Sequence, residues 1–135
     1  MLDKKSVDIN DREKNWDEYI EPRIKVLQKN GFDLESFYLC SATIEHSLQC
    51  AIQLQEEWIA KVVTRSKLKF EKTDTKKLEG MTLGQLILLY SRYSNDQKLI
   101  SQLNQFNSLR IKFIHKLLDT SIQILNEEAK KNFIL

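Results

Sequence analysis

The feature that most constrains the fold is a long stretch that contains neither glycine nor proline. From Asp33 to about Arg65 apolar residues recur at helical spacing without interruption. The whole chain contains only three glycines and one proline, which leaves little material for hairpin turns. We therefore predict an all-α fold around one long helix, whose inner side comprises Phe37, Cys40, Ile44, Leu48, Ala51, Ile52, Trp58, Ile59 and Val62.

The length of the chain limits how many domains it can form. At 135 residues it can bury a real core, and we expect a single domain over 1–135, a helical bundle of four to five helices. Residues 1–9 are expected to be frayed. A first helix is expected from about Asp11 to Asn30, ended by Gly31, with an inner face of Trp16, Tyr19, Ile20, Ile24 and Leu27.

Local start signals predict where the other helices begin. Asp33 can cap the long helix, with Phe32 stapled to Phe37. Thr82 and Gln85 form a capping box that predicts a short helix to about Tyr93. A fourth helix is expected to begin within Ser94-Asn95-Asp96-Gln97 and to reach about Asp119, where we favour a break, since one helix of some 40 residues would be unusual in so small a domain.

A basic stretch separates the long helix from the capping box, and we expect residues 66–80 to form an exposed basic loop. From Lys61 to Lys77 there are seven positive residues against Glu71 and Asp74. Clustered positive charge attracts phosphate without regard to sequence, so this loop is a candidate for nucleic-acid contact. A solvated charged loop is the more common explanation of such a pattern.

The composition excludes several classes of protein. No apolar run approaches the roughly 20 residues that span a bilayer. Cys40 and Cys50 lie about 15 Å apart along one predicted helix, too far for a disulfide, so we expect reduced thiols and a cytoplasmic protein. His46 and Cys50 are four residues apart but lack a second pair, so no metal site and no cofactor are expected.

The most unusual residue for its position is Arg110. In the predicted fourth helix, apolar residues cover an arc of roughly 160°, wider than packing on one partner needs, and Arg110 falls near its middle. An arginine there is costly unless its charge is paired or meets an anion. It could pair with a carboxylate of the long helix, such as Glu45, or it could belong to a binding site.

His115 lies five residues after Arg110, about 140° around the helix. The two side chains do not converge within one chain, so a shared site would need two copies of the helix, and we expect a homodimer. Imidazole can transfer protons near neutral pH, and a guanidinium can stabilise phosphate oxygens, so the pair suits metal-independent cleavage of RNA. Asn107 and Asp119 could support the site, and Lys112 and Lys116 could guide RNA.

The stretch Arg110-Ile111-Lys112-Phe113-Ile114-His115 resembles the R-x4-H motif of the HEPN superfamily. The likeness extends loosely to Thr43-Ile44-Glu45-His46-Ser47-Leu48 and to Thr82-Leu83-Gly84-Gln85-Leu86-Ile87. The resemblance implies a dimeric all-α protein that acts as a metal-independent ribonuclease. It also implies a role as a toxin or antiviral-defence effector, with an antitoxin or defence protein as partner, and Arg110 and His115 as the catalytic residues.

The chain departs from the family pattern at two positions. Ile111 replaces a residue that is often polar, commonly asparagine, and this bears on activity. Leu117 stands where some family toxins have a tyrosine that a nucleotidyltransferase modifies, which argues against that form of control. Two other functions remain: a non-catalytic HEPN module for dimerisation or partner binding, and an RNA-binding adaptor without cleavage.

Overall fold

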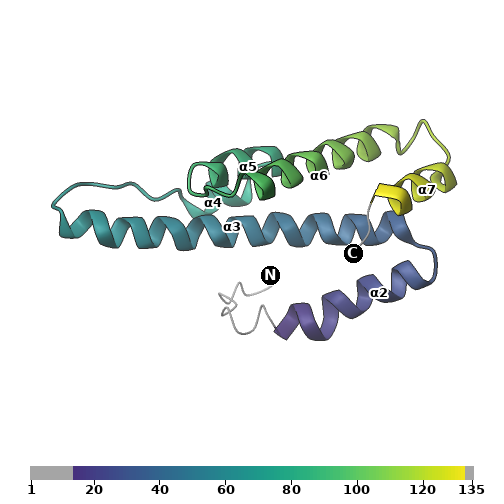
Figure 1. Cartoon of the computed structure of the whole chain (residues 1–135), viewed down its shortest axis with the longest axis horizontal. Coiled ribbons are helices and arrows are strands. Elements are labelled where there is room, and N and C mark those ends of the chain that lie inside the picture. The colour runs from purple at the N-terminus through teal and green to yellow at the C-terminus, as the bar shows by residue number, and fades with distance from the viewer. Residues whose placement is uncertain (1–13, 133–135) are drawn as a thin grey trace. The chain divides into compact units, whose positions relative to one another are not determined.

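The computed structural model describes residues 14–132, and they contain no strand. Their elements are a π-helical turn η1 (Trp16–Ile20), α2 (Glu21–Lys29), α3 (Asp33–Arg65), α4 (Thr75–Glu79), α5 (Leu83–Ser91), α6 (Gln97–Lys116) and α7 (Ile122–Asn132) (Figure 1). The predictions of an all-α chain and of one long helix ending at Arg65 are confirmed. The predicted fraying of residues 1–9 lies outside the described residues. The single domain expected from the length stays a prediction.

The chain divides into two compact units, one comprising 1–40 and 120–135 and the other comprising 41–119. The boundary between them falls within α3. The described part of the first unit comprises η1, α2, the start of α3 and α7, and the second unit contains every residue of the candidate site.

In the first unit, Pro22 determines how the opening helix is built. Pro22 lies in the first turn of α2 and has no N–H to donate to the turn before it. That preceding turn, η1, is widened to π geometry, and the N–H of Glu21 donates to the carbonyl of Trp16. Ile24 is buried as predicted, whereas Tyr19 is exposed and does not face inward.

The end of α2 and the start of α3 are held by side-chain and backbone hydrogen bonds. Gly31 adopts a φ of 78°, and the N–H of Phe32 donates to Leu27 across a Schellman motif, so the predicted stop at Gly31 is confirmed. The amide of Asn126, from α7, accepts from the N–H of Leu34 at 2.9 Å and donates to the carbonyl of Gly31 at 2.7 Å. The side chain of Asn126, 92 residues after Leu34, thus caps the end of α2 and the start of α3.

The second unit has its own hydrophobic core, formed where α3, α4 and α5 meet. Helix α6 adds Leu103 and Phe106 to it. The predicted capping box is present: the N–H of Gln85 donates to the Thr82 hydroxyl, and the Gln85 side chain accepts from the N–H of Thr82. The fully or nearly buried members of the core are Leu48, Ile52, Leu78, Leu83, Leu86 and Ile87.

Two features of this unit differ from the predictions. Trp58 and Val62 were expected on the inner side of the long helix, yet they are 64% and 43% exposed, because the core ends before the last turns of α3. The basic loop expected over 66–80 contains the short helix α4, which is anchored by the fully buried Leu78. The described residues therefore form six α-helices, one more than the largest number predicted.

The end of α6 agrees with the predicted break. Helix α6 ends at Lys116, residues 117–119 form a turn, and α7 begins at Ile122. None of the helices in residues 14–132 combines the length and the apolar character that a membrane crossing requires.

Candidate functional site

The predicted site residues all lie in or directly after α6, whose position is set at its first turn. Asp96 is the N-cap, and its carboxylate accepts from the N–H of Leu99 at 3.0 Å, within the four residues that the sequence indicated for this cap. Buried Ile100 and Phe113 fix which face of α6 is turned inward. The predicted site residues on α6 are Asn107, Arg110, Lys112, His115 and Lys116, and Asp119 lies in the turn that follows.

Arg110 lies against α3, where its Nη2 is 3.7 Å from Oε2 of Glu45. The side chains are 24% and 28% exposed. At that distance the contact is an ion pair without a close hydrogen bond, and partly exposed pairs of this kind contribute at most about 1 kcal/mol. Glu45 is thus the acidic partner that the sequence suggested, but the pairing leaves most of the guanidinium donors available to another group.

His115 is exposed in the last turn of α6. It lies about 140° around the helix from Arg110, as expected from the spacing. Within residues 14–132, no side-chain hydrogen bond or ion pair joins His115 to Arg110 or to Asp119. A single chain therefore does not bring the two motif residues into one site.

The surface between Arg110 and His115 is apolar and open. Going around α6 from Arg110 to His115, the intervening sector contains Ile114 and Ile111, which are 48% and 46% exposed. Beyond the helix, Leu118 is 95% exposed. The two charged or titratable residues of the motif thus flank an exposed apolar surface, which we call the α6 apolar patch (Ile111, Ile114 and Leu118).

This patch is open because α5 covers only the earlier part of α6 (Figure 1). The contact between the two helices includes Gly84 and Asn107: a Cβ at Gly84 would lie 3.1 Å from Nδ2 of Asn107. Since α5 begins at Leu83, none of it remains to cover the turns of α6 that follow Asn107. Asn107, predicted to support the site, is half-buried against α5.

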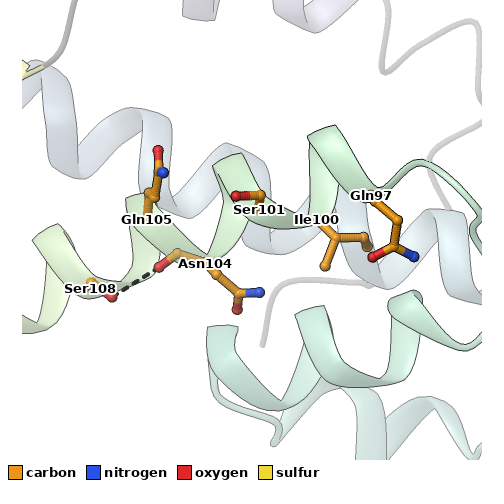
Figure 2. Close-up of a pocket in the computed structure, with 6 residues that line it drawn as sticks. All are labelled: Gln97, Ile100, Ser101, Asn104, Gln105 and Ser108. Carbon is orange, nitrogen blue, oxygen red and sulfur yellow. Dashed lines mark hydrogen bonds between the residues drawn. The ribbon is translucent and has the colours of Figure 1, made fainter.

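An uncharged polar strip runs along α6 toward His115. It forms the wall of a shallow hollow of about 410 Å³, and Figure 2 shows that all of its residues come from this one helix. The Ser108 hydroxyl donates to the carbonyl of Asn104 at 3.0 Å. His115 follows Ser108 by seven residues, so it lies on nearly the same side of the helix. The lining residues are Gln97, Ile100, Ser101, Asn104, Gln105 and Ser108.

Sequence reasoning missed a buried carboxylate, Glu56 of α3, which is 2% exposed. Its Oε2 accepts from the N–H of Thr73 at 2.9 Å, and its Oε1 accepts from the Thr73 hydroxyl at 2.6 Å and the Tyr93 hydroxyl at 2.8 Å. No local signal could have identified it, because its partners lie 17 and 37 residues away. The carboxylate ties the basic loop and the end of α5 to α3.

The same contacts change the titration of Tyr93. Burial, and then the hydrogen bond and negative charge of Glu56, raise the pKa of the Tyr93 phenol to about 12, and Arg92 opposes the shift. The phenol therefore remains protonated and keeps donating to Glu56 at neutral pH.

Cys40 and Cys50 both lie on α3, and neither forms a disulfide in the part of the chain that the structure describes. Burial raises the pKa of the Cys40 thiol to about 11, which makes it a poor nucleophile. Sγ of Cys50 lies 3.8 Å from Nε2 of His46. In the part of the chain that the structure describes, no group of three or more histidine, cysteine or acidic side chains is placed to hold a metal ion.

Comparison of the chain with family models, with curated proteins and with solved structures gives no match. The likeness to the HEPN motif therefore depends on the residues of this chain alone.

Proposed function

We propose that this protein is a HEPN-type, metal-independent endoribonuclease that acts as a homodimer. The observation that supports the proposal best is the α6 apolar patch, which occupies the sector between Arg110 and His115. If a second copy covers this patch, Arg110 and His115 of each copy come to lie at the edges of the same interface, where a cleft can form between the two helices.

The surroundings of Arg110 are compatible with this role. Its ion pair with Glu45 is loose, so a phosphate can receive donors from the guanidinium without breaking a close hydrogen bond. A contiguous exposed apolar patch is typical of a surface that another protein covers. Ile111, which departs from the family pattern, adds to the apolar surface that the dimer would bury.

The chemistry needs no metal and no other reactant. Neutral His115 accepts the proton of an RNA 2′-hydroxyl, and the 2′-oxygen attacks the adjacent phosphorus. The bond from phosphorus to the 5′-oxygen breaks, and this oxygen leaves as a hydroxyl after taking a proton from the imidazolium. Arg110 stabilises the charge on the phosphorus oxygens. The products are a 2′,3′-cyclic phosphate and a 5′-hydroxyl end. As the HEPN resemblance implies, the role would be that of a toxin or antiviral-defence effector.

A second candidate is a non-catalytic module of the same family that serves dimerisation or partner binding. The contact between Arg110 and Glu45 favours it, because a paired arginine at a helix interface needs no substrate. The two proposals agree on the dimer and differ in what Arg110 and His115 do there.

Cleavage of single-stranded RNA in EDTA tests the proposal. We expect the wild type to produce 2′,3′-cyclic phosphate ends, and Arg110→Ala and His115→Ala each to lower the rate by at least about a hundredfold, as is typical for loss of a general base or a charge-stabilising donor. Lys98→Ala, an exposed change on the same helix, is the control and should keep full activity. Binding without cleavage would identify an adaptor instead.

Stability measurements separate loss of catalysis from loss of fold. Because the pair with Glu45 is partly exposed, Arg110→Ala and Glu45→Ala should each change the free energy of unfolding by less than about 1 kcal/mol. If both changes cost several kcal/mol and the wild type cleaves no RNA, Arg110 is structural and the non-catalytic module is the correct function.

A further inference from the structure

A second charged surface lies on α3 and the basic loop, away from the motif residues of α6. The last turns of α3 and the loop after it enclose a hollow of about 430 Å³. Three cations line it, Lys61, Arg65 and Lys72, against a single carboxylate, Glu57. We call this site the basic hollow; Ala60 and Thr64 complete its wall.

The buried carboxylate of Glu56 is what holds the loop at this position. It accepts hydrogen bonds from both the N–H and the hydroxyl of Thr73, the residue directly after Lys72. Lys61 and Arg65 are one helical turn apart, so they form a pair on the same side of α3. The fold thus places Lys72 in the same hollow as Lys61 and Arg65, although like charges repel.

Glu57 is the one acidic side chain that lines the hollow, so the three cations outnumber the negative charge there. Within residues 14–132, no ion pair joins Lys61, Arg65 or Lys72 to an acidic side chain. The cluster is tolerated because it lies at the C-terminal end of α3, where the helix dipole favours positive charge. An anion that entered the hollow would meet several donors at once, without displacing an internal partner.

An exposed aromatic ring projects from the same part of α3 that lines this hollow. Trp58 is 64% exposed and precedes Arg65 by seven residues, so both project from nearly the same side of α3, about two turns apart. A row of cations beside an exposed indole is the arrangement by which proteins bind single-stranded nucleic acids: the cations contact phosphates and the ring stacks on a base. A free phosphate or a sulfated sugar would use the cations but not the indole.

We propose that the basic hollow and Trp58 form a binding surface for single-stranded RNA, in which Lys61, Arg65 and Lys72 contact the phosphates and Trp58 stacks on a base. This surface binds RNA whether or not α6 cleaves it. If α6 does cleave RNA, the basic hollow holds the strand at a second point.

Fluorescence anisotropy with a labelled, fully 2′-O-methylated single strand tests the proposal. This probe cannot undergo attack by a 2′-hydroxyl, so binding is measured separately from cleavage. The triple variant Lys61→Gln/Arg65→Gln/Lys72→Gln should bind at least about tenfold more weakly at physiological salt, and the slope of log affinity against log salt should fall by about 2, or about 0.7 for each lost phosphate contact. Glu57→Gln should bind more tightly.

Two further changes distinguish this surface from general attraction by a basic protein. Trp58→Ala should weaken binding at least about fivefold and leave the salt slope unchanged, since stacking releases no counterions. Lys29→Gln/Lys130→Gln removes two exposed cations elsewhere and should have little effect. Equal weakening by this control and by the triple variant would overturn the proposal, as would binding of an RNA duplex as tightly as the single strand. Circular dichroism should first establish that each variant is folded.

Discussion

Glu56 and Arg110 are both charged residues at packed positions of the same unit, and their surroundings differ sharply. Glu56 is almost fully buried, and three hydrogen-bond donors satisfy its two oxygens. Arg110 keeps a quarter of its side chain exposed and has one ion pair at 3.7 Å. Removing a partner from Glu56 leaves a buried carboxylate short of donors, which is costly, whereas the pair of Arg110 can exchange with solvent or with a ligand. The contacts of Glu56 therefore stabilise the fold, whereas Arg110 remains able to bind a ligand.

The hydrogen bond from Tyr93 to Glu56 gives a stability effect with a defined pH range. The pKa of Tyr93 is raised from 10.0 to about 12 in the folded protein, so its stabilising contribution is complete below about pH 10 and is lost as the pH rises toward 12. We expect Tyr93→Phe to lower the free energy of unfolding by about 1–2 kcal/mol at pH 8. Urea unfolding from pH 8 to 12 should show the gap between wild type and variant closing. A gap that stays constant over this range would mean that the phenol does not donate to Glu56.

At the scale of elements, the sequence was most informative where the signal is local. The stop at Gly31, the capping box at Thr82 and a cap within Ser94-Asn95-Asp96-Gln97 were all predicted, because each depends on residues within one turn of the helix end. The exposure of Trp58 was not predicted, because helical spacing identifies an apolar face without showing where the covering elements end.

The candidate site could likewise be predicted where it depends on one helix, and not where it depends on contacts between distant segments. The placement of Arg110 against α3 and of His115 on the exposed side of α6 could be inferred from angles around one helix. The network of Glu56 could not, since its partners lie 17 and 37 residues away along the chain. The cations of the basic hollow lie in the basic stretch that the sequence identified, but the hollow that they line could not be inferred from that stretch. Asn107 was expected to support the site, but the position of α5 determines its contact with Gly84.

Helices α2 and α3 both end in a Schellman motif, with Gly31 in the left-handed position of the first and Lys67 in that of the second. At the end of α3, the N–H of Lys67 donates to Thr64 and that of Leu68 to Val63, as in a Schellman motif, but Lys67 takes the left-handed position with a φ of 59°. A lysine there is strained relative to glycine. We expect Lys67→Gly to raise the free energy of unfolding by about 0.5–1 kcal/mol, after allowing for the entropy that glycine adds to the unfolded chain.

Gly31→Ala is the matched change at the end of α2. A Cβ there would meet no atom within 4 Å, so only backbone strain opposes it, and we expect a loss of about 1 kcal/mol. Chemical denaturation of both variants compares the two helix ends directly. If Lys67→Gly proves destabilising, the lysine side chain makes a contribution larger than its backbone strain.

At the scale of the whole molecule, the question is whether two copies associate through α6. The α6 apolar patch is open in one chain, and an apolar residue at an interface loses its favourable burial when a carboxylate replaces it. We therefore expect Ile114→Asp to shift the protein from dimer to monomer at micromolar concentration, as measured by light scattering after size exclusion. Leu88→Asp places the same charge at an exposed leucine of α5 and should leave the dimer intact.

In the proposed nuclease, catalysis depends on the association of two copies. The Ile114→Asp variant therefore tests the proposed activity as well as the dimer. Because Arg110 and His115 do not converge within one chain, an Ile114→Asp monomer should lose RNA cleavage even though both motif residues are present. It should still bind the 2′-O-methylated strand, since the basic hollow lies within a single copy. A wild-type protein that is monomeric at the concentration where it cleaves RNA would contradict the proposal, because the cleft it requires would then not exist.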